Sequence, residues 1–141
     1  NHLKENFVKR LLLDKKKLLQ ITDSIKTIIG FNDPVDQILK KWKRPNGLKI
    51  EKRTIPIGVI SVIYESRPNV TSDVATLCFK SGNPVILKGG SEAYYTNKIL
   101  ANLFRKALIK NKVNNNYVQF IESKDRKTVD FLLTRWPIIL M

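Results

Sequence analysis

Five consecutive residues after an apolar segment combine a lysine, two glycines, a hydroxyl and a carboxylate, a set that could bind a nucleotide. They are Lys88, Gly89, Gly90, Ser91 and Glu92. A lysine at a strand end would present its ammonium to a ribose hydroxyl or a 2′-phosphate, and a glutamate would accept hydrogen bonds from ribose hydroxyls. The glycines let the backbone turn and approach a ligand, and the helix that follows offers unpaired N–H groups. The alternative is a plain turn in which Ser91 caps the helix and Lys88 is solvated. The G-x-G-x-x-G pattern of many dinucleotide sites is absent.

A second polar stretch, at positions 65–69, brings a carboxylate, a guanidinium and an amide together. It consists of Glu65, Ser66, Arg67, Pro68 and Asn69. An arginine can bind a phosphate through two hydrogen bonds, and an asparagine amide can donate to a developing oxyanion. The alternative is a structural role, in which Glu65 pairs with Arg67 and Asn69 is the N-cap of the next helix.

Other reactive residue types are poorly placed for chemistry. Cys78 shares an apolar helix face with Val74 and Leu77, so we expect it in the core. His2 stands alone near the amino end, and no group of residues has the spacing of metal ligands.

The two polar stretches follow apolar runs that predict buried strands. Strands are expected over residues 58–64, 84–88 and 117–121, and helices over 70–80, from about 91 to 110 and from 125 to about 133. This alternation predicts an α/β protein with a parallel, doubly wound sheet. The inward face of the long helix is expected to contain Ile99, Leu100, Leu103, Phe104, Ala107 and Leu108. Because ligands bind beyond the carboxyl ends of such strands, both polar stretches should open onto one crevice.

The segment before this alternation is predicted to be helical and then extended. Helices are expected over 3–13 and 15–29, the second capped by Asp14 and ended by Gly30. Its buried stripe should contain Leu18, Leu19, Ile21, Ile25, Ile28 and Ile29. Asp33 and Pro34 predict a further short helix to about residue 41. A turn at 44–47 and a strand over 48–55 with one solvated face complete this part.

The composition is that of a basic globular protein. The formal net charge is +14, yet the lysines are dispersed along solvated helix faces rather than clustered. The charge therefore gives little support to a nucleic-acid-binding module. It also fits a positive surface that attracts anionic ligands such as a phosphorylated cofactor. No apolar run reaches the ~20 residues that a membrane span needs. One cysteine excludes an internal disulfide and is typical of the reducing cytoplasm.

At the two polar stretches the sequence closely resembles the γ-glutamyl phosphate reductases (glutamate-5-semialdehyde dehydrogenases). The segment GVISVIYESRPNVT at 58–71 is the most specific part of the resemblance. It continues through Leu77, Cys78, Lys80, Gly82, Asn83 and residues 85–93, and it includes 33–35, 42–48 and 125–126. The resemblance therefore covers nearly the whole chain.

The resemblance implies the aldehyde-dehydrogenase fold and an NADPH-dependent reduction of L-glutamyl 5-phosphate to glutamate 5-semialdehyde, a step of proline biosynthesis. It implies that residues 1–55 pack on a partial Rossmann-like NADP-binding domain at 56–141. By position, Lys88 matches the lysine that contacts the adenosine ribose and its 2′-phosphate, and Ser91 or Glu92 matches the ribose-binding carboxylate. The implied cofactor-binding residues are Glu65, Ser66, Arg67, Pro68, Lys88, Gly89, Gly90, Ser91 and Glu92. Asn69 is the candidate oxyanion or substrate contact.

The family's nucleophile is a cysteine in a separate downstream domain, where a thioester forms before hydride transfer. Cys78 cannot replace it, so we expect a fragment that is inactive alone. The tail from Arg135 to Met141 departs from the family pattern and suggests a truncation or a shifted reading frame. A homo-oligomeric full-length parent is expected. The reductase portion of a bifunctional pyrroline-5-carboxylate synthase is an alternative parent.

Overall fold

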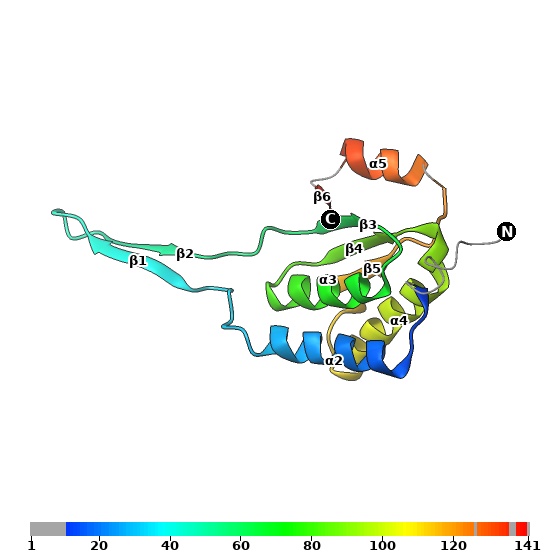
Figure 1. Cartoon of the computed structure of the whole chain (residues 1–141). Coiled ribbons are helices and arrows are strands. Elements are labelled where there is room, and N and C mark those ends of the chain that lie inside the picture. The colour runs from blue at the N-terminus through cyan, green and yellow to red at the C-terminus, as the bar shows by residue number, and fades with distance from the viewer. Residues whose placement is uncertain (1–10, 126, 136–137, 141) are drawn as a thin grey trace.

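A parallel sheet with helices on both faces forms the body of the protein. The computed structural model describes residues 11–125, 127–135 and 138–140, so the helix expected over 3–13 lies almost wholly outside the described part (Figure 1). The strands are β3 (Ile60–Tyr64), β4 (Val85–Gly89), β5 (Val118–Phe120) and β6 (Ile138–Leu140). All pair in parallel, in the order β5-β4-β3-β6. The predicted α/β class is confirmed, and β6 adds a strand that the sequence did not predict.

The helices cover both faces of this sheet. Helices α3 (Pro68–Lys80) and α4 (Tyr94–Lys110) lie on one face, and α5 (Lys127–Arg135) lies on the other (Figure 1). Short 3-10 turns, η1 (Ser91–Ala93) and η2 (Asn115–Tyr117), precede α4 and β5. The chain runs outward from β3 to β5 and then returns to the far side of β3. This reversal is the switch point at which doubly wound sheets bind ligands.

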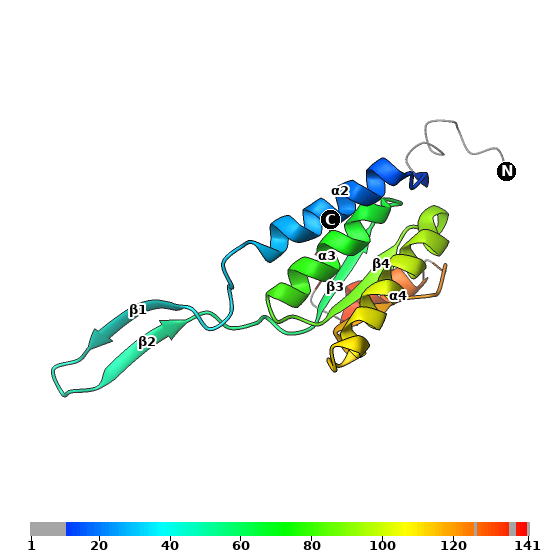
Figure 2. The same ribbon diagram turned by 90° about the horizontal axis from the view of Figure 1, so that it is seen from below.

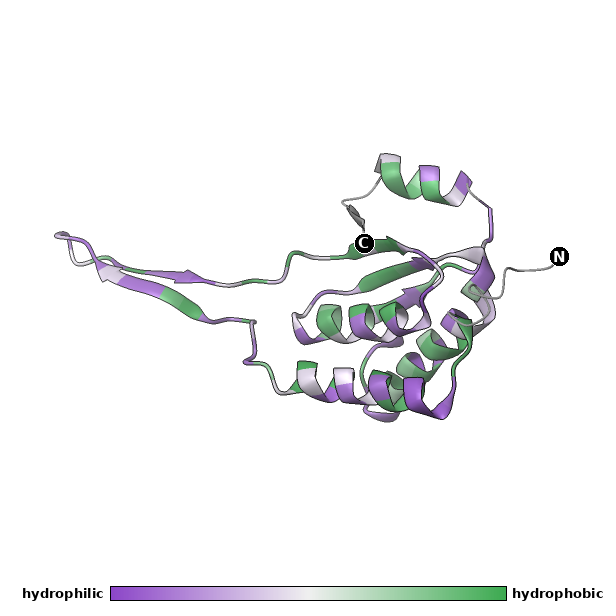
Figure 3. Ribbon diagram, viewed as in Figure 1, coloured by the Kyte–Doolittle hydropathy of each residue, from purple (hydrophilic) through white to green (hydrophobic). Residues whose placement is uncertain are grey.

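The core lies between the sheet and the α3–α4 layer. Val62, Val85, Leu87 and Val118 are almost fully buried in the central strands. They pack with Val74, Ala75, Ala101 and Leu108 of the covering helices. Figure 3 shows the hydrophobic colouring concentrated on the sheet strands, with mixed colouring along the helices. Burying each such Val or Leu side chain stabilises the folded state by about 1.5–3 kcal/mol. This packing holds in place the sheet edge at which the candidate site lies.

Helix α2 (Lys15–Ile29) begins and ends as the sequence predicts. The Asp14 carboxylate accepts a hydrogen bond of 2.7 Å from the Lys17 backbone N–H, and Gly30 is the C-cap. Helix α2 lies alongside α3 (Figure 2), where the Ser24 hydroxyl donates to Asp73 at 2.7 Å. The predicted buried stripe is too wide. Ile21 and Ile28 are buried, Ile25 is partly buried, and Leu18, Leu19 and Ile29 are exposed.

The prediction of a short helix over 34–41 is wrong. Strand β1 (Ile38–Lys43) pairs there with β2 (Lys49–Arg53) in an antiparallel hairpin that projects from the body (Figures 1 and 2). The Asp33 carboxylate does accept from the Val35 N–H, as a cap would. Asp36, however, has φ +55°, which stops a right-handed helix. The predicted turn at 44–47 joins the two strands. Residues 48–55 were expected to form a strand with one solvated face. In the structure both faces of β2 are solvated, and of its residues Ile50 alone is partly buried.

The inward face of α4 also differs from the prediction. Leu108 is buried as expected, but Ile99 is 60% exposed, Leu103 is 55% exposed, and Ala107 is exposed. Ala101 and Asn97 are fully buried instead. A small residue and a polar residue therefore face the sheet, because α4 approaches it closely.

Candidate nucleotide-binding site

The two polar stretches meet at the carboxyl edge of the sheet. Strands β3 and β4 are paired so that Tyr64 lies opposite Gly89. The residues that follow, 65–67 and 90–92, therefore leave the sheet at the same level. The expectation that both stretches share one edge of the sheet agrees with this register.

A side-chain hydrogen bond joins the two stretches. The Ser66 hydroxyl, which is buried, donates to Glu92 Oε2 at 2.6 Å. This bond is the main cause that lowers the pKa of the Glu92 carboxyl, followed by bonds from its own backbone N–H and from Ser91. A Cβ at Gly90 would overlap Ser66 Oγ and lie 3.1 Å from the Ser66 nitrogen. Glycine is therefore required at 90 for the two backbones to approach.

A buried polar cluster supports Gly89 from below. The Thr71 hydroxyl donates to Asn97 Oδ1 at 3.1 Å, so the Tyr64 hydroxyl, 2.7 Å away, must donate to Thr71. Burial raises the pKa of Tyr64 to about 12. A Cβ at Gly89 would overlap Asn97 Nδ2, an amide nitrogen that has no hydrogen-bond partner in the described part of the chain. No pattern in the sequence predicted these roles for Thr71 and Asn97. The one available sign was that Asn97 lies four residues before Ala101 and so shares its helix face.

A pocket of about 190 Å³ opens above these residues. Its lining comes from β3, β4, the turn after β4 and the β5–α5 segment: Ile63, Tyr64, Lys88, Gly89, Gly90, Ser91, Glu92, Lys124, Asp125 and Val129. Lys88 is 7% exposed, and its ammonium donates to the Gly89 carbonyl at 3.3 Å. The alternative in which Lys88 is simply solvated is therefore wrong. Lys124, Asp125 and Val129 were not predicted, because they approach the pocket from the loop after β5 and from α5, more than thirty residues after Glu92.

The remaining predicted residues lie at the start of α3. Arg67 is exposed and occupies the N-cap position without a side-chain capping bond, and Pro68 is the first helical residue. Asn69 is therefore inside the helix and is not its N-cap. Glu65 is also exposed and forms no ion pair with Arg67; the Arg67 backbone N–H donates to the Glu65 carbonyl at 2.8 Å. The structural alternative for this stretch is therefore wrong in both its parts.

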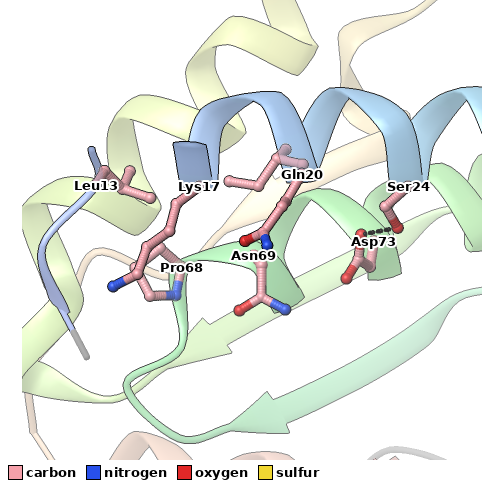
Figure 4. Close-up of a pocket in the computed structure, with 8 residues that line it drawn as sticks. Leu13, Lys17, Gln20, Ser24, Pro68, Asn69 and Asp73 are labelled. Atoms are coloured by element: carbon pink, nitrogen blue, oxygen red, sulfur yellow. Dashed lines mark hydrogen bonds between the residues drawn. The ribbon is translucent and has the colours of Figure 1, made fainter. Parts of the chain in front are cut away.

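Asn69 faces a different depression, between α2 and α3. This groove of about 350 Å³ is lined by Leu13, Lys17, Gln20, Ile21, Ser24, Pro68, Asn69 and Asp73 (Figure 4). Asn69 and Arg67 do not line the pocket of Lys88. The stretch 65–69 is thus divided: Ser66 bonds to Glu92, which lines the pocket of Lys88, and Asn69 lines the groove.

Cys78 is a core residue. It is buried in α3, and burial raises the pKa of its thiol to about 11. A thiol with that pKa is protonated near neutral pH and is a poor nucleophile. Among the described residues, no group of three or more His, Cys, Asp or Glu side chains could hold a metal ion. None of the helices described is both long and apolar enough to cross a membrane.

The comparison with solved structures first defines the class. A propionaldehyde dehydrogenase from Rhodopseudomonas palustris superposes on 95% of this chain with a TM-score of 0.64 at 15% sequence identity, which shows a shared fold. The crystal structure of γ-glutamyl phosphate reductase from Thermotoga maritima superposes on 99% of this chain and 34% of that chain, with a TM-score of 0.93 and 38% identity. The protein therefore has part of the aldehyde-dehydrogenase fold.

Sequence relatives then show which proteins the chain is homologous to, although no model of a known protein family matches the chain. The γ-glutamyl phosphate reductase of Petrotoga mobilis is 42% identical over 137 residues, which are 97% of this chain and 33% of the relative. That of Halothermothrix orenii is 45% identical over 141 residues, 99% of this chain and 34% of the relative. The chain is a homologue of the γ-glutamyl phosphate reductases, and it spans about a third of the length of the curated relatives it matches. The predicted resemblance to these reductases is confirmed.

Proposed function

We propose that this chain forms the NADP(H)-binding part of an enzyme that reduces L-glutamyl 5-phosphate to glutamate 5-semialdehyde in proline biosynthesis. The observation that most supports this proposal is the pocket at the sheet edge, where a buried lysine lies beneath two loops joined by the Ser66–Glu92 bond. NADPH, when bound, supplies the hydride for the reduction.

The residues of the pocket would divide the work of holding the cofactor. The Lys88 ammonium and the Ser91 hydroxyl would contact the adenosine ribose, and Gly89 and Gly90 would let the backbone approach it. The pocket of about 190 Å³ is smaller than the roughly 300–1,000 Å³ of sites that enclose a drug-sized ligand. The described residues would therefore contact one portion of the dinucleotide.

The groove between α2 and α3 is our candidate for the substrate side. In it the Gln20 and Asn69 amides lie next to each other, and the Lys17 ammonium extends toward Pro68 (Figure 4). An amide suits an acyl oxygen that gains negative charge, and an ammonium suits a phosphate. We assign Asn69 as the oxyanion or substrate contact on this basis.

The covalent step would need a nucleophile that this sequence does not supply. Cys78 is the one cysteine of the 141 residues, and it is buried with a raised thiol pKa. We therefore propose that this polypeptide alone does not turn over. Purified chain given NADP⁺, phosphate and glutamate 5-semialdehyde should form no NADPH; sustained NADPH production would contradict the proposal.

The remaining expectations concern organisation. We propose that residues 1–55 pack on a partial NADP-binding domain at 56–141, in the cytoplasm; the packing of α2 on α3 supports this division. We also propose a homo-oligomeric full-length protein. The hairpin supports this, because Leu39 is 58% exposed and Ile38 and Trp42 are also exposed.

Cofactor binding is tested with one buried and one exposed lysine. Lys88→Met removes the ammonium from the pocket, and Lys110→Met removes an exposed ammonium at the end of α4. We expect the first variant to bind NADPH at least about tenfold more weakly than the wild type in calorimetry, since a charge-assisted bond is lost. The second should bind as the wild type does. Equal binding by all three proteins would contradict the proposed site.

A further inference from the structure

Lys124 lies in a notch between two aromatic rings. Its ammonium is 4.8 Å from the ring centroid of Tyr94 and 4.9 Å from that of Tyr95. The two rings are nearly perpendicular, with centroids 5.2 Å apart. Each ring face attracts a cation, so the start of α4 holds the Lys124 ammonium in place although the residue is in an exposed loop.

The same lysine lines the pocket that contains Lys88. The two carboxylates of that pocket have other partners. Glu92 accepts from Ser66 at 2.6 Å, and Asp125 accepts from the Lys127 backbone N–H at 3.0 Å. In the neighbouring loop, Glu122 pairs with Lys98 at 2.7 Å. Neither Lys124 nor Lys88 forms an ion pair with any described residue, so both ammonium groups at this pocket can still pair with an anion.

Two such cations in one small pocket favour a ligand with two negative charges. A phosphate monoester carries about −1.5 to −2 charges near neutral pH. A ribose with a free 2′-hydroxyl would offer no such charge.

We propose that Lys124 is a specificity-determining residue that binds the 2′-phosphate of the cofactor together with Lys88, and that Tyr94 and Tyr95 are its positioning residues. This inference rests on the proposed NADP(H) site. It goes beyond that site because it assigns the preference for a phosphorylated ribose to a loop after β5.

The test measures binding of 2′,5′-ADP and 5′-AMP to the purified chain by calorimetry. Lys124→Gln should weaken 2′,5′-ADP about tenfold and leave 5′-AMP unchanged, because one charge-assisted contact to the 2′-phosphate is lost. Lys127→Gln, an exposed lysine of the same segment outside the pocket lining, is the matched control and should change neither affinity by more than about twofold.

The positioning role has its own readout. The double variant Tyr94→Leu with Tyr95→Leu should lose part of the preference for 2′,5′-ADP at unchanged 5′-AMP affinity. The corresponding double phenylalanine variant should retain the preference, since it keeps both ring faces. Equal losses for both ligands would indicate a merely structural role and overturn this part.

The outcomes separate the two proposals. Wild-type chain that prefers 2′,5′-ADP, with a Lys124→Gln variant that keeps the preference, overturns the role of Lys124 and leaves the cofactor site standing. Wild-type chain that binds both ligands equally also overturns it. Wild-type chain that binds neither ligand overturns the proposed cofactor site and the role of Lys124 with it.

Discussion

The Ser66 hydroxyl lies 2.6 Å from Glu92 Oε2, so the loops that follow two adjacent strands are joined side chain to side chain. Through this bond the loop after β3 is attached to Glu92, one of the residues that line the Lys88 pocket. The bond also explains why Gly90, beside it, has no room for a side chain.

Ser66→Ala should raise the pKa of the Glu92 carboxyl, because the largest cause of its lowered value is removed. In the wild type, the stabilisation from this group is present above the carboxyl's unfolded pKa and is lost as pH falls through the lower folded value. NMR titration of the Glu92 side chain measures the shift directly. Identical titration curves for the two proteins would show that the Ser66 bond does not form in solution.

Gly90→Ala should destabilise the fold by about 1–3 kcal/mol, because the new methyl group meets the Ser66 side chain and backbone. Gly30→Ala is the control, since Gly30 has an ordinary helical φ of −69° and a Cβ there meets backbone atoms no closer than 3.4 Å. Urea unfolding of both variants gives the comparison. A Gly90→Ala protein as stable as Gly30→Ala would rule out the close approach.

Thr71→Val should cost roughly 1–3 kcal/mol, because it leaves the buried Tyr64 hydroxyl and Asn97 Oδ1 without partners. Tyr64→Phe removes one end of the chain of bonds and leaves Thr71 free to donate to Asn97. Its cost should be smaller, about 0.5–1.5 kcal/mol. Denaturant unfolding of the two single variants checks this order, and a reversed order would refute the donor assignment.

Stability should decline between about pH 10 and pH 12 because of Tyr64. Its pKa is raised from 10.0 to about 12, so the neutral form favours the folded state. That contribution is complete below the unfolded pKa and disappears as pH rises through the folded one. Cys78, with its pKa raised from 9.0 to about 11, acts in the same direction at lower pH. Thermal unfolding of the Cys78→Ala variant and of the Cys78→Ala, Tyr64→Phe double variant, measured as a function of pH, isolates the contribution of Tyr64. If the stability of both variants fell equally between about pH 10 and pH 12, the prediction would be contradicted.

The two central strands, β3 and β4, were predictable because they lie in nearly continuous apolar runs. Residues 60–64 and 85–89 are buried or partly buried on both faces of the sheet, as expected for strands in the middle of a parallel sheet. The hairpin was not predictable in the same way. Asp33 and Pro34 have the local chemistry of a helix start, whereas strand β1 exists because of its pairing with residues 49–53.

The candidate site was half predictable. Lys88 and its glycines follow a strand directly, so their place at the sheet edge came from local sequence. The contacts between Ser66 and Glu92 and between Lys124 and the tyrosine rings join residues 26 and about 30 positions apart. Such contacts depend on strand order and register, which spacing alone did not determine.

The central claim is that residues 88–92 and Ser66 contact the cofactor. The most direct measurement is an NMR titration of the isotope-labelled chain with NADPH. The account predicts that backbone amide signals of residues 88–92, Ser66 and Lys124 shift together and saturate, while those of the distant hairpin at 38–53 stay in place. Saturating NADPH that leaves residues 88–92 unchanged would contradict the account.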